Sequence, residues 1–107
     1  PNLQLTLHFH NTRGMGLANV LAAVQSGIVR FDGSLGGLGG CPYAKGATGN
    51  VATEDVLYML NGLGIETGID FEKALIAGEY ITKQIGKQNA SRVARAIAAK
   101  KINGDQK

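Results

Sequence analysis

Hydrophobic and polar residues alternate without interruption over residues 3–10, near the start of the chain. One face carries Leu3, Leu5, Leu7 and Phe9, and the other carries Gln4, Thr6, His8 and His10. Successive side chains of a β-strand point to opposite faces, so this two-residue period predicts a strand with one side packed on a core. A second apolar run at residues 28–31 predicts another strand.

A helical pattern separates these two strands. Its apolar residues, at i, i+3, i+4 and i+7, are Leu17, Val20, Leu21 and Val24. Residues 11–16 are predicted to form a turn before the helix, and Gly27 suits the cap at its C-terminus. Two strands joined through a helix are expected to lie parallel in a right-handed crossover, which makes the chain an α/β protein.

Three more helices are predicted after residue 52. The capping residue types at their N-termini are Thr53, Asp70 and Ser91. Glu54 and Asp55 suit the first turn of the first helix, where its dipole favours negative charge, and Gly62 and Gly64 are expected to end it. Each predicted helix has one apolar stripe. In chain order, the stripes are Val56, Met59, Leu60 and Leu63 in the first helix; Phe71, Ala74, Leu75, Gly78 and Ile81 in the second; and Val93, Ala94 and Ile97 in the third.

His8 and His10 are the first residues that suggest chemistry. Because they are two apart on the first strand, both imidazoles are expected to project from one face at its C-terminal end. Active sites of parallel α/β folds lie at that end, and two imidazoles there can hold a divalent metal ion. A chance pair of surface histidines is the alternative interpretation.

A glycine-rich segment at residues 33–50 follows the second strand. Seven of its residues are glycines, which predicts a long loop, and its spacing matches neither a P-loop nor a dinucleotide fingerprint. A long loop after a strand often serves as a lid or a binding loop. Cys41 within it is placed for proton transfer, or is a loop thiol without a role.

Composition and charge narrow the class of protein. A chain of 107 residues is at most one domain, and its single cysteine cannot form an internal disulfide, which favours an intracellular setting. No apolar run is long enough to span a membrane. Residues 83–107 hold seven Lys or Arg and one Asp, so this basic tail is either an anion-binding surface or a solvated helix face. No aromatic residue is interleaved with these charges, so nucleic acid is not an expected partner.

Three segments together resemble a known enzyme family. HFHNTRG at residues 8–14, SLGGLGGCPYAKGATGN at residues 34–50 and TEDVLYMLNGLGIETGID at residues 53–70 are similar to the C-terminal part of 3-hydroxy-3-methylglutaryl-CoA (HMG-CoA) lyase. That family belongs to a wider group of divalent-metal enzymes that cleave or form carbon–carbon bonds on a (β/α)8 TIM barrel. The resemblance implies the last two βα units of the barrel plus C-terminal helices.

The resemblance also implies a division of the chain and a set of site residues. The chain is then a single partial domain, with the two βα units in residues 1–65 and the C-terminal helices and basic tail in residues 66–107. Asn11 stands where many relatives have Asp after the second histidine. The implied roles are metal binding by His8, His10 and Asn50, catalysis by Cys41, and a loop or lid containing Gly36, Gly37, Gly39 and Gly40.

The activity implied by the resemblance is hydroxymethylglutaryl-CoA lyase. Mg²⁺ or Mn²⁺ would bind oxygens of the acyl-CoA substrate, and a retro-Claisen step of leucine degradation would give acetoacetate and acetyl-CoA, whose enolate Cys41 would protonate. Two alternatives remain open: a lyase for a longer-branched 3-hydroxyglutaryl-CoA, and a non-catalytic interaction module with a vestigial site.

The resemblance places other functional groups outside this sequence. The family's remaining metal-binding aspartate and its catalytic arginine belong to the first strand and the units after it, and a start at Pro1 suggests that an N-terminal segment is missing. The chain alone is therefore expected to be inactive. It is expected to form a homo-oligomer, with four copies as one form, or to associate with the missing segment. The expected location is a bacterial cytoplasm, with N-terminal targeting left open.

Overall fold

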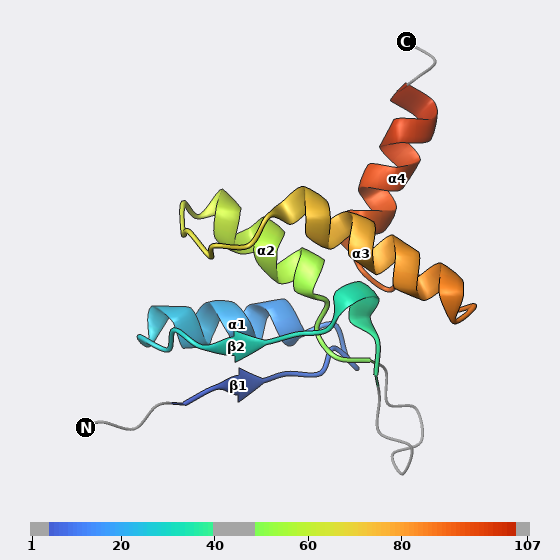
Figure 1. Cartoon of the computed structure of the whole chain (residues 1–107). Helices are drawn as coiled ribbons and strands as arrows, with labels where there is room; N and C mark the ends of the chain where they lie inside the picture. The colour runs from blue at the N-terminus through green and yellow to red at the C-terminus, as the bar shows by residue number, and fades with distance from the viewer. Residues whose placement is uncertain (1–4, 40–48, 105–107) are drawn as a thin grey trace.

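The computed structural model describes residues 5–39 and 49–104. Within these ranges the chain forms a pair of short parallel strands, a single turn of 3-10 helix and a series of α-helices (Figure 1). In chain order the elements are β1 (Leu7–His8), α1 (Gly16–Gln25), β2 (Phe31–Asp32), η1 (Leu35–Gly37), α2 (Thr53–Gly62), α3 (Phe71–Gln84) and α4 (Arg92–Gly104). The strand–helix–strand order and the parallel pairing agree with the α/β prediction.

The two strands are shorter than the sequence pattern predicts. β1 begins at Leu7, residues 1–4 lie outside the described residues, and β2 begins at Phe31 rather than at residue 28. A strand is defined by its ladder of hydrogen bonds, and in the described part of the chain β1 and β2 pair only with each other. The apolar residues that precede the two strands are exposed to solvent, with Leu5 at 52% and Val29 at 85%.

One small core lies between α1, the strands and α2. Val20 of α1 is fully buried, and it packs with Val51, Val56 and Leu60. The half-buried side chains around them are Phe9, Leu17, Val24, Phe31 and Met59. The predicted alternation holds from Leu7 to His10, because Leu7 and Phe9 are partly buried while His8 and His10 are exposed; it does not extend back to Leu5, which is exposed.

Helix α2 begins differently from the prediction. Its N-cap position is Ala52, with no side-chain cap, so the prediction that Thr53 caps this helix is wrong. A backbone bridge replaces the side-chain cap: Ser34 pairs with Ala52 in parallel, and the N–H of Thr53 donates to the carbonyl of Ser34 at 3.0 Å. Val56, Met59 and Leu60 face the core as predicted, but the buried face also includes Leu57, which is 2% exposed, and does not reach Leu63, which is 53% exposed.

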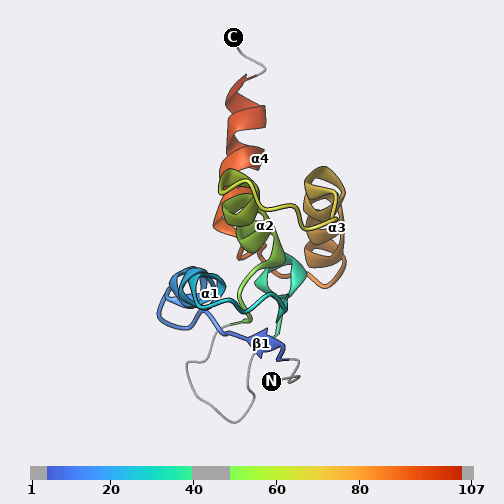
Figure 2. The same ribbon diagram turned by 90° about the vertical axis from the view of Figure 1, so that its left-hand side faces the viewer.

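The last two helices begin where the sequence predicts. The side chain of Asp70 accepts from the N–H of Lys73 at 3.1 Å, and the hydroxyl of Ser91 accepts from the N–H of Ala94 at 3.0 Å. η1 packs against both α2 and α3, while α4 contacts α2 and points away from the strand pair (Figures 1 and 2). None of the helices in the described residues is long and apolar enough to cross a membrane.

Candidate metal centre

Two β-type pairings bring the predicted site residues together. His8 lies at the end of β1 opposite Asp32 of β2, and His10 forms an antiparallel bridge with Asn50, which leads into α2. The imidazole rings of His8 and His10 lie edge to face, with centroids 5.1 Å apart. The structure thus places three of the predicted site residues, His8, His10 and Asn50, around one end of the strand pair.

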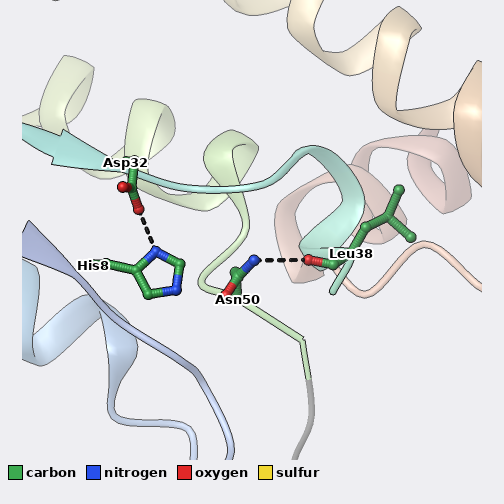
Figure 3. Close-up of polar contacts among 4 residues, drawn as sticks. All are labelled: His8, Asp32, Leu38 and Asn50. Atoms are coloured by element: carbon green, nitrogen blue, oxygen red, sulfur yellow. Dashed lines mark hydrogen bonds and ion pairs between the residues drawn. The ribbon is translucent and has the colours of Figure 1, made fainter. Parts of the chain in front are cut away.

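The ring of His8 is held by a carboxylate. Its Nδ1 contacts Oδ1 of Asp32 from the neighbouring strand (Figure 3). Both side chains are about half exposed, at 46% for His8 and 53% for Asp32. Because Nδ1 is engaged, Nε2 is the nitrogen of His8 that is left for a ligand. No pattern in the sequence marks Asp32 as a site residue, because its position directly opposite His8 depends on strand register.

The amide of Asn50 is oriented by the backbone after η1. Its Nδ2 donates to the carbonyl oxygen of Leu38 at 3.1 Å (Figure 3). With the amide nitrogen used in this way, the side-chain oxygen Oδ1 is the atom left for a ligand. Gly39 makes this approach possible, because its φ is +101° and a Cβ there would lie 2.7 Å from Nδ2 of Asn50.

The glycine turn at η1 rests on a buried glutamate. Glu54 is fully buried at the start of α2, and both of its carboxylate oxygens lie 2.9 Å from the N–H of Gly36. Gly36 has a φ of +65°, and a Cβ there would lie 2.7 Å from Thr82. Gly36 and Gly37 are both buried, so these two members of the predicted lid form a closely packed turn. Cys41 and Gly40 lie outside the described residues.

From the sequence, Glu54 was expected only to interact with the dipole of its helix. Its structural role is different, because its side chain joins α2, η1 and α3, where a Cβ on Gly78 would overlap its Oε2. A signal was present in the sequence: Leu57 lies three residues later on the same helix face, and a large apolar residue there indicates that this face is buried.

Burial raises the pKa of Glu54 above its ordinary value of 4.5, and the nearby carboxylates of Asp55 and Glu79 act in the same direction. The hydrogen bond from Gly36 opposes this shift. A raised folded-state pKa makes the folded chain hold its proton more tightly, so the free energy of unfolding falls as the pH rises through that pKa.

We expect Glu54→Gln to reduce this loss of stability above pH 4.5, because glutamine has no proton to release. Urea denaturation across the acid-to-neutral range measures the effect. Glu72→Gln, which neutralises an exposed carboxylate on α3, is the control and is expected to keep the wild-type profile. Parallel pH profiles for the wild type and Glu54→Gln would contradict the prediction.

The donor set at the strand ends fits part of a divalent metal centre. Imidazole nitrogens and an amide oxygen are ligands that first-row divalent ions accept, and three protein ligands leave other coordination positions open. Across residues 5–39 and 49–104, no group of three or more His, Cys, Asp or Glu side chains is placed to hold a metal ion. A metal centre at these strand ends would therefore need Asn50 as its third ligand among the described residues.

Two parallel strands joined through a helix, with polar side chains gathered at one end, place the chain in the class of parallel α/β proteins that carry their sites at the strand ends. The chain belongs to the HMGL-like family, whose model matches residues 1–81. It is 56% identical over 97 residues to the mitochondrial hydroxymethylglutaryl-CoA lyase of Arabidopsis thaliana, covering 91% of this chain and 21% of that protein. It is 57% identical over 100 residues to the 3-hydroxy-3-isohexenylglutaryl-CoA/hydroxy-methylglutaryl-CoA lyase of Pseudomonas aeruginosa, covering 94% of this chain and 33% of that protein.

Solved structures of the same family agree with the fold. The chain superposes on the HMG-CoA lyase of Bacillus subtilis with a TM-score of 0.84 and 51% identity, covering 92% of this chain and 33% of that one. It superposes on the HMG-CoA lyase of Acinetobacter baumannii, which was solved with coenzyme A and 3-methylmalate, with a TM-score of 0.82 and 52% identity. This match covers 87% of this chain and 30% of that one. The prediction of a partial TIM barrel is confirmed, and the chain spans a third or less of these relatives.

Proposed function

We propose that the chain provides the last two βα units of a hydroxymethylglutaryl-CoA lyase, which cleaves HMG-CoA to acetyl-CoA and acetoacetate. The observation that carries the proposal is the bridge between His10 and Asn50 beside His8, which gathers three ligand-type side chains at the strand ends. Identities of 51–57% to lyases over most of this chain support the same activity.

Each site residue has a proposed role. His8 through Nε2, His10 through its imidazole and Asn50 through Oδ1 would hold Mg²⁺ or Mn²⁺. When bound, the ion supplies a Lewis acid that stabilises negative charge on the substrate's oxygens during carbon–carbon cleavage. Cys41 would donate its thiol proton to the acetyl carbon after cleavage, since an ordinary thiol, with a pKa of about 8.5, is protonated at neutral pH.

Neither alternative, a lyase for a longer-branched 3-hydroxyglutaryl-CoA or a non-catalytic interaction module, is favoured over hydroxymethylglutaryl-CoA lyase activity. Curated relatives at 52–57% identity carry hydroxymethylglutaryl-CoA lyase in their names, and one of these names adds the longer-branched isohexenyl substrate. An interaction module with a vestigial site has no need to keep His8, His10 and Asn50 in one place. The acyl-CoA substrate proposed here follows the relatives, one of which was solved with coenzyme A.

We infer that turnover needs more of the barrel than this chain contains. A groove of about 490 Å³ lies beside β2 and beneath α2, and its apolar lining includes Val24, Ile28, Phe31, Leu57 and Leu60. This groove can receive the preceding barrel segment or another copy of the chain.

The proposed division of the chain is two βα units in residues 1–65 and C-terminal helices in residues 66–107. The proposed location is the cytoplasm.

We expect Mn²⁺ to stabilise the chain and His8→Ala to remove this effect. An ion that binds only the folded state at one hundred times its Kd raises the free energy of unfolding by about 2.7 kcal/mol. Urea denaturation with and without Mn²⁺ measures this difference. Glu72→Gln, at an exposed position on α3 far along the chain from His8, is expected to respond to Mn²⁺ like the wild type.

A chimera extends the test to catalysis. This chain replaces the matching third of the Pseudomonas aeruginosa lyase, to which it is 57% identical. The chimera is expected to release acetoacetate from HMG-CoA in the presence of Mn²⁺, whereas its His8→Ala variant and the isolated chain are not. A folded chimera without lyase activity would contradict the proposed function, and Mn²⁺ stabilisation that persists in His8→Ala would contradict the proposed ligand.

A further inference from the structure

We propose that Asp32 is a positioning residue that fixes the ring of His8 with Nε2 presented to the metal ion. The inference rests on the proposed metal centre and adds to it a residue that the resemblance did not supply. It begins from the register of the sheet: His8 and Asp32 are direct partners across the parallel pair. Neighbouring strands lie about 4.8 Å apart, so partnered side chains on one face are within reach of each other.

The contact selects one tautomer of His8. Oδ1 of Asp32 meets Nδ1 of the ring, and an ionised carboxylate can only accept a hydrogen bond. Nδ1 must therefore carry the hydrogen, which leaves the lone pair on Nε2. A histidine without such a partner exchanges between tautomers, and only part of its population then has Nε2 ready to coordinate.

The contact also selects one orientation of the ring. His8 is 46% exposed in its side chain, so packing alone does not fix its rotation. Asp32 holds the ring from the neighbouring strand and stays on the side opposite to Nε2, because the two ring nitrogens point apart. Asp32 therefore lies on the far side of the His8 ring from the proposed metal position. It is not itself a proposed ligand, because no group of three or more His, Cys, Asp or Glu side chains among the described residues is placed to hold a metal ion.

Asn50 is oriented in the same way by a different group. The carbonyl of Leu38 takes one hydrogen of Nδ2 and leaves Oδ1 for the ion. His8 and Asn50, two proposed ligands from separate segments, thus each have their other polar atom engaged by a fixed partner (Figure 3). This arrangement is typical of metal sites, in which partners behind the ligands orient them and tune their affinity.

The test reads the tautomer first, without metal. ¹⁵N NMR of histidine-labelled chain at a pH of about 8, where an ordinary histidine is neutral, reports which ring nitrogen carries hydrogen. We expect Nδ1–H for His8 in the wild type and in Asp32→Asn, whose amide oxygen can still accept, and a mixture in Asp32→Ala. Glu72→Gln, which removes a distant negative charge, is expected to match the wild type. A wild-type tautomer in Asp32→Ala overturns the proposal.

Mn²⁺ titration of the same variants supplies the second measurement. We expect Asp32→Ala to bind Mn²⁺ about 10- to 100-fold more weakly than the wild type, and Asp32→Asn to lose clearly less. An equal loss in both variants means that charge rather than orientation is responsible, and it overturns the proposal. A wild-type chain that binds no Mn²⁺ counts against the proposed metal centre, and the tautomer measurement alone then decides the role of Asp32.

Discussion

Substituting Gly49 with alanine is expected to lower the free energy of unfolding by about 3 kcal/mol and to abolish Mn²⁺ binding by the chain. A Cβ at this position would overlap the carbonyl oxygen of Gly37 and lie 2.8 Å from the carbonyl oxygen of Gly39. Both neighbours are backbone atoms, so no side-chain rotation relieves the overlap. The turn after η1 and the segment leading into α2 must then move apart.

The expected loss of metal binding follows from the position of Asn50, the next residue. Separation of the two segments breaks the hydrogen bond from Nδ2 of Asn50 to Leu38 and releases the amide from its orientation. It also strains the bond from the N–H of Asn11 to the carbonyl of Gly49, which joins this segment to the residues after β1. One added methyl group therefore affects both the proposed ligand and the backbone that carries it.

Gly62→Ala is the matched control for this substitution. Gly62 is the last residue of α2, and a Cβ there would have no atom within 4 Å. Alanine is the better helix former by roughly 1 kcal/mol, so this variant is expected to keep or gain stability and to bind Mn²⁺ normally. Urea denaturation and Mn²⁺ titration of both variants measure the contrast. Wild-type stability and metal binding in Gly49→Ala would contradict the close approach of these segments.

The parts of the fold that the sequence predicted are those with local signals. Asp70 and Ser91 cap α3 and α4 because each cap is a bond within three residues, which a short pattern can indicate. The N-cap of α2 was misassigned because its start is fixed by Ser34, a residue far back in the chain. Strand lengths were overestimated because alternation records which residues can form a strand, whereas pairing requires a neighbour.

The contrast between local signals and long-range contacts also explains which site residues could be predicted from the sequence. His8 and His10 were found through a two-residue spacing, and Asn50 entered only through the family resemblance, since no local pattern marks a lone asparagine. Asp32 and Glu54 were missed as site residues, because their contacts join positions 24 and 18 residues apart. Such contacts depend on strand register and on how a helix packs, and neither can be read from a short segment.

Asp55→Ala is expected to lower the free energy of unfolding by about 3 kcal/mol, because hydrogen bonds to a charged group are the strong ones and the fully buried hydroxyl of Ser91 would lose its acceptor. Asp55 belongs to the first turn of α2, but its 5% exposed carboxylate binds the start of α4. Oδ1 accepts from the hydroxyl of Ser91 at 2.6 Å and from the N–H of Val93 at 3.1 Å, and Oδ2 accepts from the N–H of Arg92 at 3.4 Å.

One carboxylate thus serves the N-termini of two helices. The dipoles of α2 and α4 both favour a negative charge at this point, which offsets part of the cost of burying it. Ser91 is fully buried, and its hydroxyl donates to Asp55 while accepting from the N–H of Ala94. Removing the carboxylate leaves this hydroxyl and two backbone N–H groups without their acceptor, so the attachment of α4 to α2 weakens.

Asp70→Ala separates this effect from ordinary helix capping. Asp70 caps α3 from an exposed position through a single bond to the N–H of Lys73, and loss of such a cap costs about 1 kcal/mol. Urea denaturation is therefore expected to show a clearly larger loss for Asp55→Ala. Hydrogen exchange of the Val93 and Ala94 amides should accelerate only in Asp55→Ala, because only that variant releases the first turn of α4. Equal losses in the two variants would mean that the buried carboxylate does no more than an exposed cap.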